Sequence, residues 1–288
     1  MTLANIDYIH ADEADRNISE HFSKAIIEQA AVKNKIIYEQ PLNERMRNWL
    51  RLEYLFQCVS HRINGLSSWD SRIALEGIIK ILDFISRNDF KPDLIKDIEY
   101  HIQSLQRWQK FPQVDTVRLQ KLMNELLHIK ESLVQIEGQF AGVLSKHHLL
   151  SSVRQRNIIP GGSCQFDLPA YYYWSQKSAK DRQHNLQSWL NAFEPLQKAN
   201  ELNLYLIRQN AHTSHQIANG GFFQSKLDAQ KSYQIIRIIV PEDFPCYPEI
   251  SGGKHRFNLR FFEHQQLEGK PIQSQKKLHF DLCCCSFI

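Results

Sequence analysis

Three cations share one side of a short segment near the end of the chain, and their spacing indicates a surface that binds anions. Residues 254–261 alternate polar and apolar side chains, which predicts a β-strand with two different faces. The apolar side carries Phe257, Leu259 and Phe261. The polar side carries Lys254, Arg256 and Arg260 and no acid, and guanidinium groups bind carboxylates through paired hydrogen bonds. We therefore predict a carboxylate-binding surface here, although periodicity alone also allows an ordinary solvated sheet face.

Four further arginines are candidates for the same surface. Arg154 and Arg156 lie just before a turn at residues 160–162, where proline and glycine favour a tight reversal. The alternation of residues 163–167 predicts a strand after the turn, which would bring these arginines beside the sheet. Arg51 lies on the polar side of a predicted helix, and Arg87 lies at the end of another. The alternative for Arg154 and Arg156 is solvent-exposed charge, and for Arg87 it is a cation that complements the helix dipole.

Cysteine chemistry is a competing interpretation. Cys283, Cys284 and Cys285 with His279 suggest a metal cluster, but adjacent strand residues diverge and structural zinc uses separated Cys/His pairs. Cys164 is conceivable as the nucleophile of a thiol enzyme, but no recognisable signature surrounds it, and a small packed residue explains it better. The sequence has no P-loop, no GxGxxG and no HExxH motif. We predict no catalysis, no metal and no cofactor.

The elements that position these residues change character along the chain. Helical spacing of apolar residues predicts helices from residue 44, with Asn43 as N-cap, and then over 68–86, 92–108 and 115–137, followed by a shorter helical segment over 138–152. Residues 178–210 return to helix. Period-two patterns predict strands over 212–224, 232–240, 254–263 and 276–284, with a bulge or turn at Gly220–Gly221 and an irregular connection around Pro241, Pro245 and Pro248.

These patterns predict an α+β protein: an N-terminal all-α helical-bundle domain and a small C-terminal antiparallel β domain. We expect residues 1–35 to be an N-terminal extension, with a helix over 12–32, and residues 36–152 to be the helical domain. Residues 170–210 are expected to pack back onto that domain. The β domain is expected to comprise residues 153–169 and 211–288.

Composition narrows the class of protein. The 288 residues are 42% hydrophobic and 23% charged with a net charge of +4, which is typical of a globular chain and only mildly basic. No apolar run reaches the ~18 residues of a membrane span, and the first residues lack the features of a signal peptide. The six cysteines form no disulfide framework. We expect a cytoplasmic protein without a membrane partner.

Four motifs together resemble the ZapD family of bacterial cell-division proteins. In chain order they are PLNERMRNWLRLE (41–53), VRQRNIIPGGSCQFDLP (153–169), LIRQ (206–209) and YPEISGGKHRFNLRF (247–261). The similarity runs from about residue 36 to about residue 285. Residues 1–35 and 286–288 have no counterpart in the shorter members.

The resemblance implies a cytoplasmic homodimer that binds the tubulin-like GTPase FtsZ through the C-terminal tail of FtsZ and crosslinks its filaments at the midcell division ring. It implies no catalysis. A basic surface would receive the acidic tail, and the matching positions are Arg256 and Arg260, with Arg87 and Arg51 from the helical domain. A basic nucleic-acid-binding module is the alternative. The aromatic residues of 254–261 alternate inward and could not stack on bases from the cationic side, so we predict no nucleic-acid partner.

Overall fold

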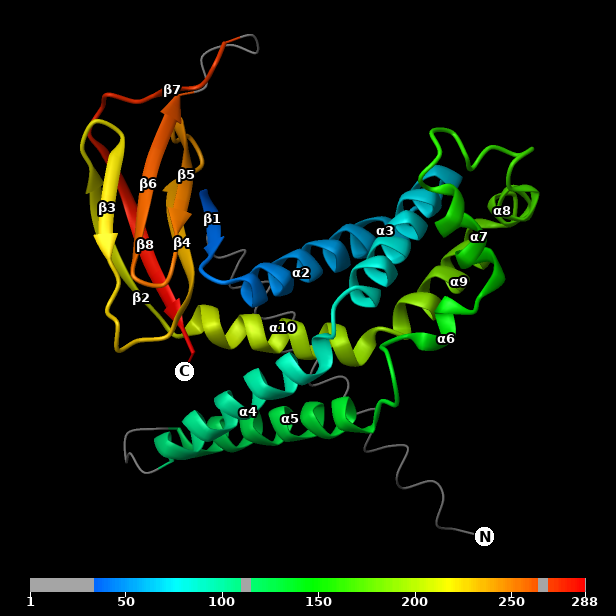
Figure 1. The fold of residues 1–288 in the computed structure, drawn as a ribbon, viewed down its shortest axis with the longest axis horizontal. Coiled ribbons are helices and arrows are strands. Elements are labelled where there is room, and N and C mark those ends of the chain that lie inside the picture. Colours follow the sequence, from blue (N-terminus) through cyan, green and yellow to red (C-terminus); the bar gives the residue numbers. More distant parts are fainter. Residues whose placement is uncertain (1–33, 110–114, 264–268, 288) are drawn as a thin grey trace. The chain divides into compact units, whose positions relative to one another are not determined.

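Helices occupy the first part of the chain and strands the last part in the computed structural model, which describes residues 34–109, 115–263 and 269–287 (Figure 1). The predicted α+β class is confirmed. The chain divides into two compact units. The helical unit contains residues 41–211 and 230–235 and the C-terminal end from residue 285, and the described part of the β unit contains residues 34–40, 212–229 and 236–284. The predicted helix over 12–32 lies outside the described residues.

Nine helices lie in the described part of the helical unit. The predicted helices from residue 44 and over 68–86, 92–108 and 115–137 are confirmed with modest changes of boundary, whereas the segments predicted over 138–152 and 178–210 each contain two helices. The nine helices are α2 (Glu44–Ile63), α3 (Ser68–Ser86), α4 (Phe90–Trp108), α5 (Thr116–Gln135), α6 (Gly142–Ser145), α7 (His148–Arg156), α8 (Pro169–Ser175), α9 (Ala179–Asn191) and α10 (Glu194–Gln209). Asn43 caps α2 as predicted, since its Oδ1 accepts a hydrogen bond from Met46 N at 2.9 Å. Asp115 caps α5 in the same manner through Val117 N and Arg118 N.

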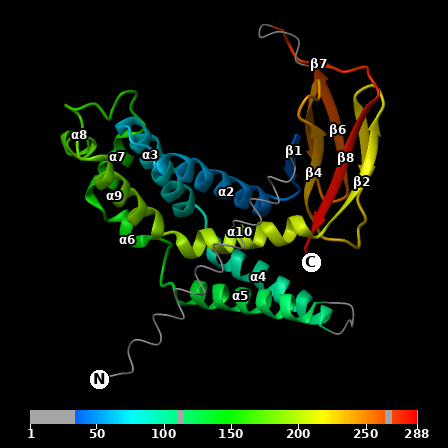
Figure 2. The same cartoon turned by 180° about the vertical axis from the view of Figure 1, so that it is seen from behind.

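Helix α10 is the centre of the helical unit. It packs against α2 on one side and against the α4–α5 pair on the other, as Figures 1 and 2 show from opposite directions. Its buried face explains this position, because Leu196, Leu202, Leu204, Leu206 and Ile207 are all almost inaccessible to solvent. Helices α8 and α9 pack beside α3. Residues 170–210 thus belong to the helical unit, after an intervening turn.

Two sheets build the β unit. The strands are β1 (Lys35–Pro41), β2 (Ala211–Ala218), β3 (Phe222–Lys226), β4 (Tyr233–Pro241), β5 (Cys246–Gly252), β6 (Arg256–Glu263), β7 (Ile272–Gln273) and β8 (Leu278–Ser286). One sheet has the order β1-β4-β8-β2, and the other has the order β3-β6-β5 with β7 paired to the end of β6. Phe280 of β8 packs against Phe223 of β3 and Phe261 of β6, with ring centroids 5.3 and 5.4 Å apart. The aromatic core therefore lies between the two sheets.

The glycine pair at residues 220–221 is a turn, as predicted. Both glycines have positive φ (58° and 64°), which side chains with a Cβ rarely adopt. A Cβ on Gly221 would lie 2.4 Å from Ser274 O, so this glycine also permits a close backbone approach. The turn divides the predicted strand 212–224 into β2 and β3, and these two strands belong to different sheets.

The predicted strand over residues 163–167 is wrong. This segment forms consecutive turns, in which Cys164 N donates to Gly161 O and Asp167 N donates to Cys164 O. The apolar Phe166 of this segment is not buried, since 83% of its surface is exposed. Backbone groups satisfied by local turns need no neighbouring strand. The whole segment 153–169 lies in the helical unit rather than in the β domain where we expected it, and residues 36–40 lie in the β unit.

The connection around Pro241, Pro245 and Pro248 is also more regular than predicted. Strand β5 begins at Cys246 and pairs antiparallel with β6, and Pro248 occupies a position opposite Phe261. Proline is tolerated here because β5 is an edge strand of its sheet, so one side of its backbone needs no partner.

Candidate anion-binding sites

The predicted cationic face of residues 254–261 is present in the β unit. Strand β6 buries Phe257, Leu259 and Phe261, while Arg256 and Arg260 are exposed on the opposite face. Strand β6 pairs with β3 on one side and with β5 on the other. Arg260 therefore has a neighbour on each side, whereas Arg256, at the start of β6, has a neighbour on β3. No carboxylate of the described residues forms an ion pair with either guanidinium group. Both groups are therefore available to a ligand.

Lys254 lies in the tight connection between β5 and β6. Gly253 N donates to Arg256 O at 3.0 Å, which closes the turn and leaves Lys254 and His255 exposed. An open hollow of about 340 Å³ lies here, lined by residues 251–256 and Asn258. The structure thus brings Lys254 and Arg256 together at one end of the cationic face.

Neighbouring strands add side chains that the β6 pattern could not reveal. Lys226 lies opposite Arg256, and Phe222 and Glu249 lie opposite Arg260 on either side. Residues directly opposite each other in antiparallel strands share a face. The face therefore carries a fourth cation at Lys226, one acid at Glu249 and an aromatic ring at Phe222 that is 39% exposed.

A second aromatic contact completes this surface. Tyr247 of β5 lies opposite Phe262 of β6, and their rings stack with centroids 5.9 Å apart. We call the set on this side of the sheet the β6 face: Phe222, Lys226, Tyr247, Glu249, Lys254, Arg256, Arg260 and Phe262. Cations beside aromatic rings can bind a peptide that carries both carboxylates and apolar side chains. Only the strand register, which places residues of β3 and β5 opposite residues of β6, reveals this combination.

Three of the other predicted arginines gather in the helical unit. Arg87, Arg154 and Arg156 line one cavity of about 750 Å³, which we call the α3 pocket. Helix α3 forms one wall, and the end of α7 with the turn at residues 157–163 forms another. Arg87 is the C-cap residue of α3, as its alternative interpretation predicted. The strand error explains why we expected Arg154 and Arg156 beside the sheet.

Some cations of the α3 pocket are held by acids of the protein itself. Arg154 Nε donates to Asp83 Oδ1 at 2.5 Å and its Nη2 donates to Ser86 Oγ at 3.2 Å. Arg156 Nη1 lies 3.5 Å from Asp167 Oδ1. Arg87 has no ion-pair partner among the described residues. The pocket therefore mixes fixed and free positive charge.

Arg51 belongs to neither site. It lies on the exposed face of α2, and its Nη1 is 3.7 Å from Glu44 Oε1. More than half of its side chain is accessible to solvent, so this pair contributes little to stability. Arg51 stays a prediction that the geometry does not connect to the other candidates.

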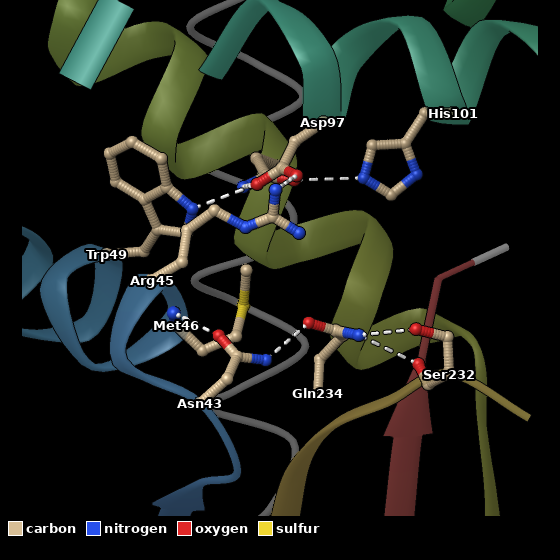
Figure 3. A network of polar contacts seen from close by, with 9 residues as sticks. Asn43, Arg45, Met46, Trp49, Asp97, His101, Ser232 and Gln234 are labelled. Carbon is tan, nitrogen blue, oxygen red and sulfur yellow. Dashed lines mark hydrogen bonds and ion pairs between the residues drawn. The ribbon is translucent and has the colours of Figure 1, made fainter. Parts of the chain in front are cut away.

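A buried polar network in the helical unit escaped the sequence analysis (Figure 3). Asp97 of α4 accepts a hydrogen bond from Trp49 Nε1 at 2.9 Å and forms an ion pair with Arg45 Nη1 at 3.1 Å. Asn203 of α10 donates to Asp97 Oδ2 at 3.3 Å and accepts from His101 Nε2 at 3.0 Å. These five residues lie on three helices, α2, α4 and α10, and only packing brings the three helices together.

Burial shifts both titratable groups of this network toward their neutral forms. Desolvation raises the pKa of Asp97 to about 6, against the opposing effects of Arg45, Trp49 and Asn203. Desolvation lowers the pKa of His101 to about 4, and its Nδ1 has no hydrogen-bond partner among the described residues. Neither Asp97 nor His101 lines the α3 pocket or the hollow beside Lys254. We interpret the network as a device that orders α2, α4 and α10.

The cysteine interpretations find little support in the geometry. Cys164 Sγ lies 3.3 Å from Asp167 Oδ2, and no histidine forms a hydrogen bond with it among the described residues. Burial raises the pKa of Cys284 to about 11, which opposes formation of a reactive thiolate. Over the described ranges, no group of three or more His, Cys, Asp or Glu residues has a geometry that suits a metal ion.

The fold and these surfaces define a two-unit α+β protein whose exposed cations form candidate anion-binding sites. No helix in the described ranges is long and apolar enough to cross a membrane. The ZapD family model, described as a cell division protein, matches residues 50–260. Two similar proteins, from Methylococcus capsulatus and Chromobacterium violaceum, are both named "Cell division protein ZapD". They are 36% and 33% identical to this chain, over 88% of its length and 99% and 100% of theirs. The chain belongs to the ZapD family of cell division proteins.

Membership of this family establishes a role in cell division. The family is one of cell division proteins and not a known enzyme family. The matched region begins at residue 50, so residues 1–49 lie outside it.

Proposed function

We propose that the protein binds the C-terminal tail of FtsZ through the β6 face and, as a homodimer, crosslinks FtsZ filaments in the division ring at midcell. The family name implies an association with the ring, and the sequence resemblance supplies the acidic tail as the ligand. The protein acts in the cytoplasm without a cofactor. Two tail sites in one dimer let a single molecule join two filaments, and a filament presents many tails, so weak single contacts add up to strong binding.

One observation carries this proposal: Arg256 and Arg260 lie on the exposed face of β6 without an ionic partner among the described residues. Free guanidinium groups form bidentate hydrogen bonds with carboxylates. The exposed ring of Phe222 and the Tyr247–Phe262 pair lie on the same face and suit the apolar side chains of a peptide. Because the cations are exposed, the interaction should weaken as salt screens it over about 10 Å at 0.1 M ionic strength.

The test is cosedimentation with polymerised FtsZ. The double variant Arg256→Glu/Arg260→Glu should no longer pellet with filaments, because the carboxylates of the acidic tail would be repelled by the two new glutamates. The control Lys146→Glu/Lys180→Glu makes the same change of net charge at two exposed positions of the helical unit and should pellet like the wild type. Circular dichroism confirms that each variant is folded. Wild-type pelleting by the β6 variant would show that the tail does not bind this face.

A second arm tests the ligand and the crosslinking. FtsZ that lacks its C-terminal tail should neither bind nor be bundled, and retained bundling would identify the filament body as the target. Analytical ultracentrifugation should give the mass of a dimer for the full chain. A strictly monomeric protein that still bundles filaments would contradict the crosslinking proposal.

A nucleic-acid partner is the second candidate, because Phe222 and the Tyr247–Phe262 pair lie on the cationic face itself. Exposed aromatic rings beside arginines are the elements that stack on single-stranded bases. The aromatic residues at 257 and 261 face inward and cannot stack on bases, but these further rings lie on the cationic side of the sheet. A gel-shift titration with single-stranded DNA and RNA at about 0.1 M salt decides the matter. Binding abolished by Arg256→Glu/Arg260→Glu, together with unchanged pelleting on FtsZ, would favour the nucleic acid.

A further inference from the structure

The α3 pocket has a charge pattern that the tail proposal does not use. One stripe of α3 faces it, because residues 72, 76, 80, 83 and 87 recur at intervals of three or four. The stripe alternates in charge: Arg72, Glu76, Lys80, Asp83 and Arg87. A helix rises about 1.5 Å per residue, so Lys80 and Arg87 are separated by about 10 Å along the axis. Two cations thus stand on one wall at a spacing that a small molecule can bridge.

Positive charge exceeds negative charge in the lining. Five cations line the pocket against the two carboxylates of Glu76 and Asp83. Each carboxylate is already engaged, since Arg72 Nε lies 2.9 Å from Glu76 Oε1 and Arg154 Nε lies 2.5 Å from Asp83 Oδ1. Lys80 forms no ion pair with any described residue, and the same holds for Arg87. Arg156 is paired with Asp167, which does not line the pocket, so the unpaired positive charge of the lining is that of Lys80 and Arg87.

The opposite wall is held by local turns and contains no acid. Gly162 N donates to Ile159 O and Ile159 N donates to Arg156 O, so successive turns hold this segment. A Cβ on Gly162 would lie 2.6 Å from Arg156 O, which means that the turn accepts glycine alone without rearrangement. Ile158 and Ile159 are exposed at the rim and offer an apolar surface beside the charges.

We propose that the α3 pocket binds a small ligand with two or more linked phosphate groups. The cavity volume of about 750 Å³ falls in the range of small-molecule sites, roughly 300–1,000 Å³. Di- and triphosphates carry several negative charges in a compact chain, so one such ligand can contact both Lys80 and Arg87, which a single carboxylate cannot. Lys80 and Arg87 bind terminal phosphate oxygens, and the guanidinium groups fixed by Glu76 and Asp83 donate without losing side-chain freedom.

Two probes distinguish the possible sources of this phosphate chemistry. Inorganic triphosphate and a nucleoside triphosphate are each titrated into the full-length protein by isothermal titration calorimetry, in a buffer free of phosphate and sulfate. We expect both to bind, with tighter binding of the nucleotide if the apolar rim of Ile158 and Ile159 contacts its base. Binding should also raise the melting temperature, by an amount that grows with the logarithm of the ligand concentration once this exceeds the dissociation constant. No heat and no thermal shift up to millimolar concentrations would overturn the proposal.

Matched variants locate the site. Lys80→Gln/Arg87→Gln removes the two free cations from an exposed helix face and should weaken triphosphate binding by about tenfold or more, because each charge-assisted hydrogen bond to phosphate is strong. Lys146→Gln/Lys180→Gln makes the same change of charge at two exposed positions outside both sites and should leave binding unaltered. Equal weakening by both variants would show a general charge effect and refute the pocket.

A third ligand separates this proposal from the tail. A peptide with the sequence of the FtsZ tail is titrated into the same variants. If the peptide depends on Lys80 and Arg87 while triphosphate does not bind, then the pocket is a peptide site and the phosphate proposal fails. If triphosphate fails while FtsZ pelleting still depends on Arg256 and Arg260, then only this inference falls.

Discussion

The buried Asp97 provides a test of the helical unit that does not depend on any partner. We expect Asp97→Asn to change how stability depends on pH. Burial raises the pKa of this carboxyl from 3.8 to about 6, so the folded chain holds the proton more tightly than the unfolded chain. Its contribution therefore favours folding at low pH and is lost as the pH rises through about 6. A difference of about two pKa units corresponds to about 3 kcal/mol at 1.36 kcal/mol per unit.

His101 acts in the opposite direction. Burial lowers its pKa from 6.5 to about 4, so the unfolded chain binds this proton first, and stability is lost as the pH falls from about 6.5 to about 4. This term is also about 3 kcal/mol. In the wild-type protein the two contributions nearly cancel between pH 4 and pH 6. Removing Asp97 exposes the His101 term alone.

The assay is urea denaturation at a series of pH values, with the result expressed as the difference between variant and wild type. The difference removes the contribution of every other titrating group. The stability of Asp97→Asn should fall, relative to the wild type, by about 2 to 3 kcal/mol between pH 7 and pH 4. His101→Asn should show the opposite slope.

A control from the same helix sharpens the comparison. Asp93→Asn makes the same substitution at an exposed carboxyl of α4 whose charge is only the smallest cause of the raised Asp97 pKa, so its curve should depart from that of the wild type far less than the curve of Asp97→Asn does. A curve for Asp97→Asn parallel to that of the wild type would refute the assignment of a buried, proton-retaining carboxyl. A slope for His101→Asn with the same sign as that for Asp97→Asn would refute the compensation between the two groups.

Two further substitutions test the packing of the helical unit. Arg208→Met breaks the bidentate pair with Glu53, whose N–O distances are 2.6 and 2.7 Å and whose side chains are largely buried. This change should lower the free energy of unfolding by about 2–4 kcal/mol. The double variant Arg208→Met/Glu53→Met should recover much of this loss, and an unchanged loss would contradict the pairing. Asn43→Ala removes the cap of α2 and the contact of its Nδ2 with Gln234 Oε1, and should cost about 1–2 kcal/mol in the same measurement, whereas Asn43→Asp, which keeps the cap, should cost less.

Local pattern determined much of this protein. Helices at residues 44–63, 68–86 and 116–135 follow from apolar spacing and from caps at Asn43 and Asp115, and these depend on neighbours within one or two turns. The two faces of β6 follow from the alternation at Arg256 and Arg260, since a pleated strand imposes period two on any sequence. The motifs along the chain also sufficed to indicate the family.

Tertiary structure decided which of these residues meet. Arg87 and Arg154 are 67 positions apart and share a pocket because α3 and α7 pack together, whereas the alternation at residues 163–167 suggested a strand that local turns replace. Strand register alone placed Phe222 and Glu249 beside Arg260. Periodicity records whether a side chain faces the core or the solvent, but it carries no information on which distant segment packs there, because many pairings bury the same apolar area.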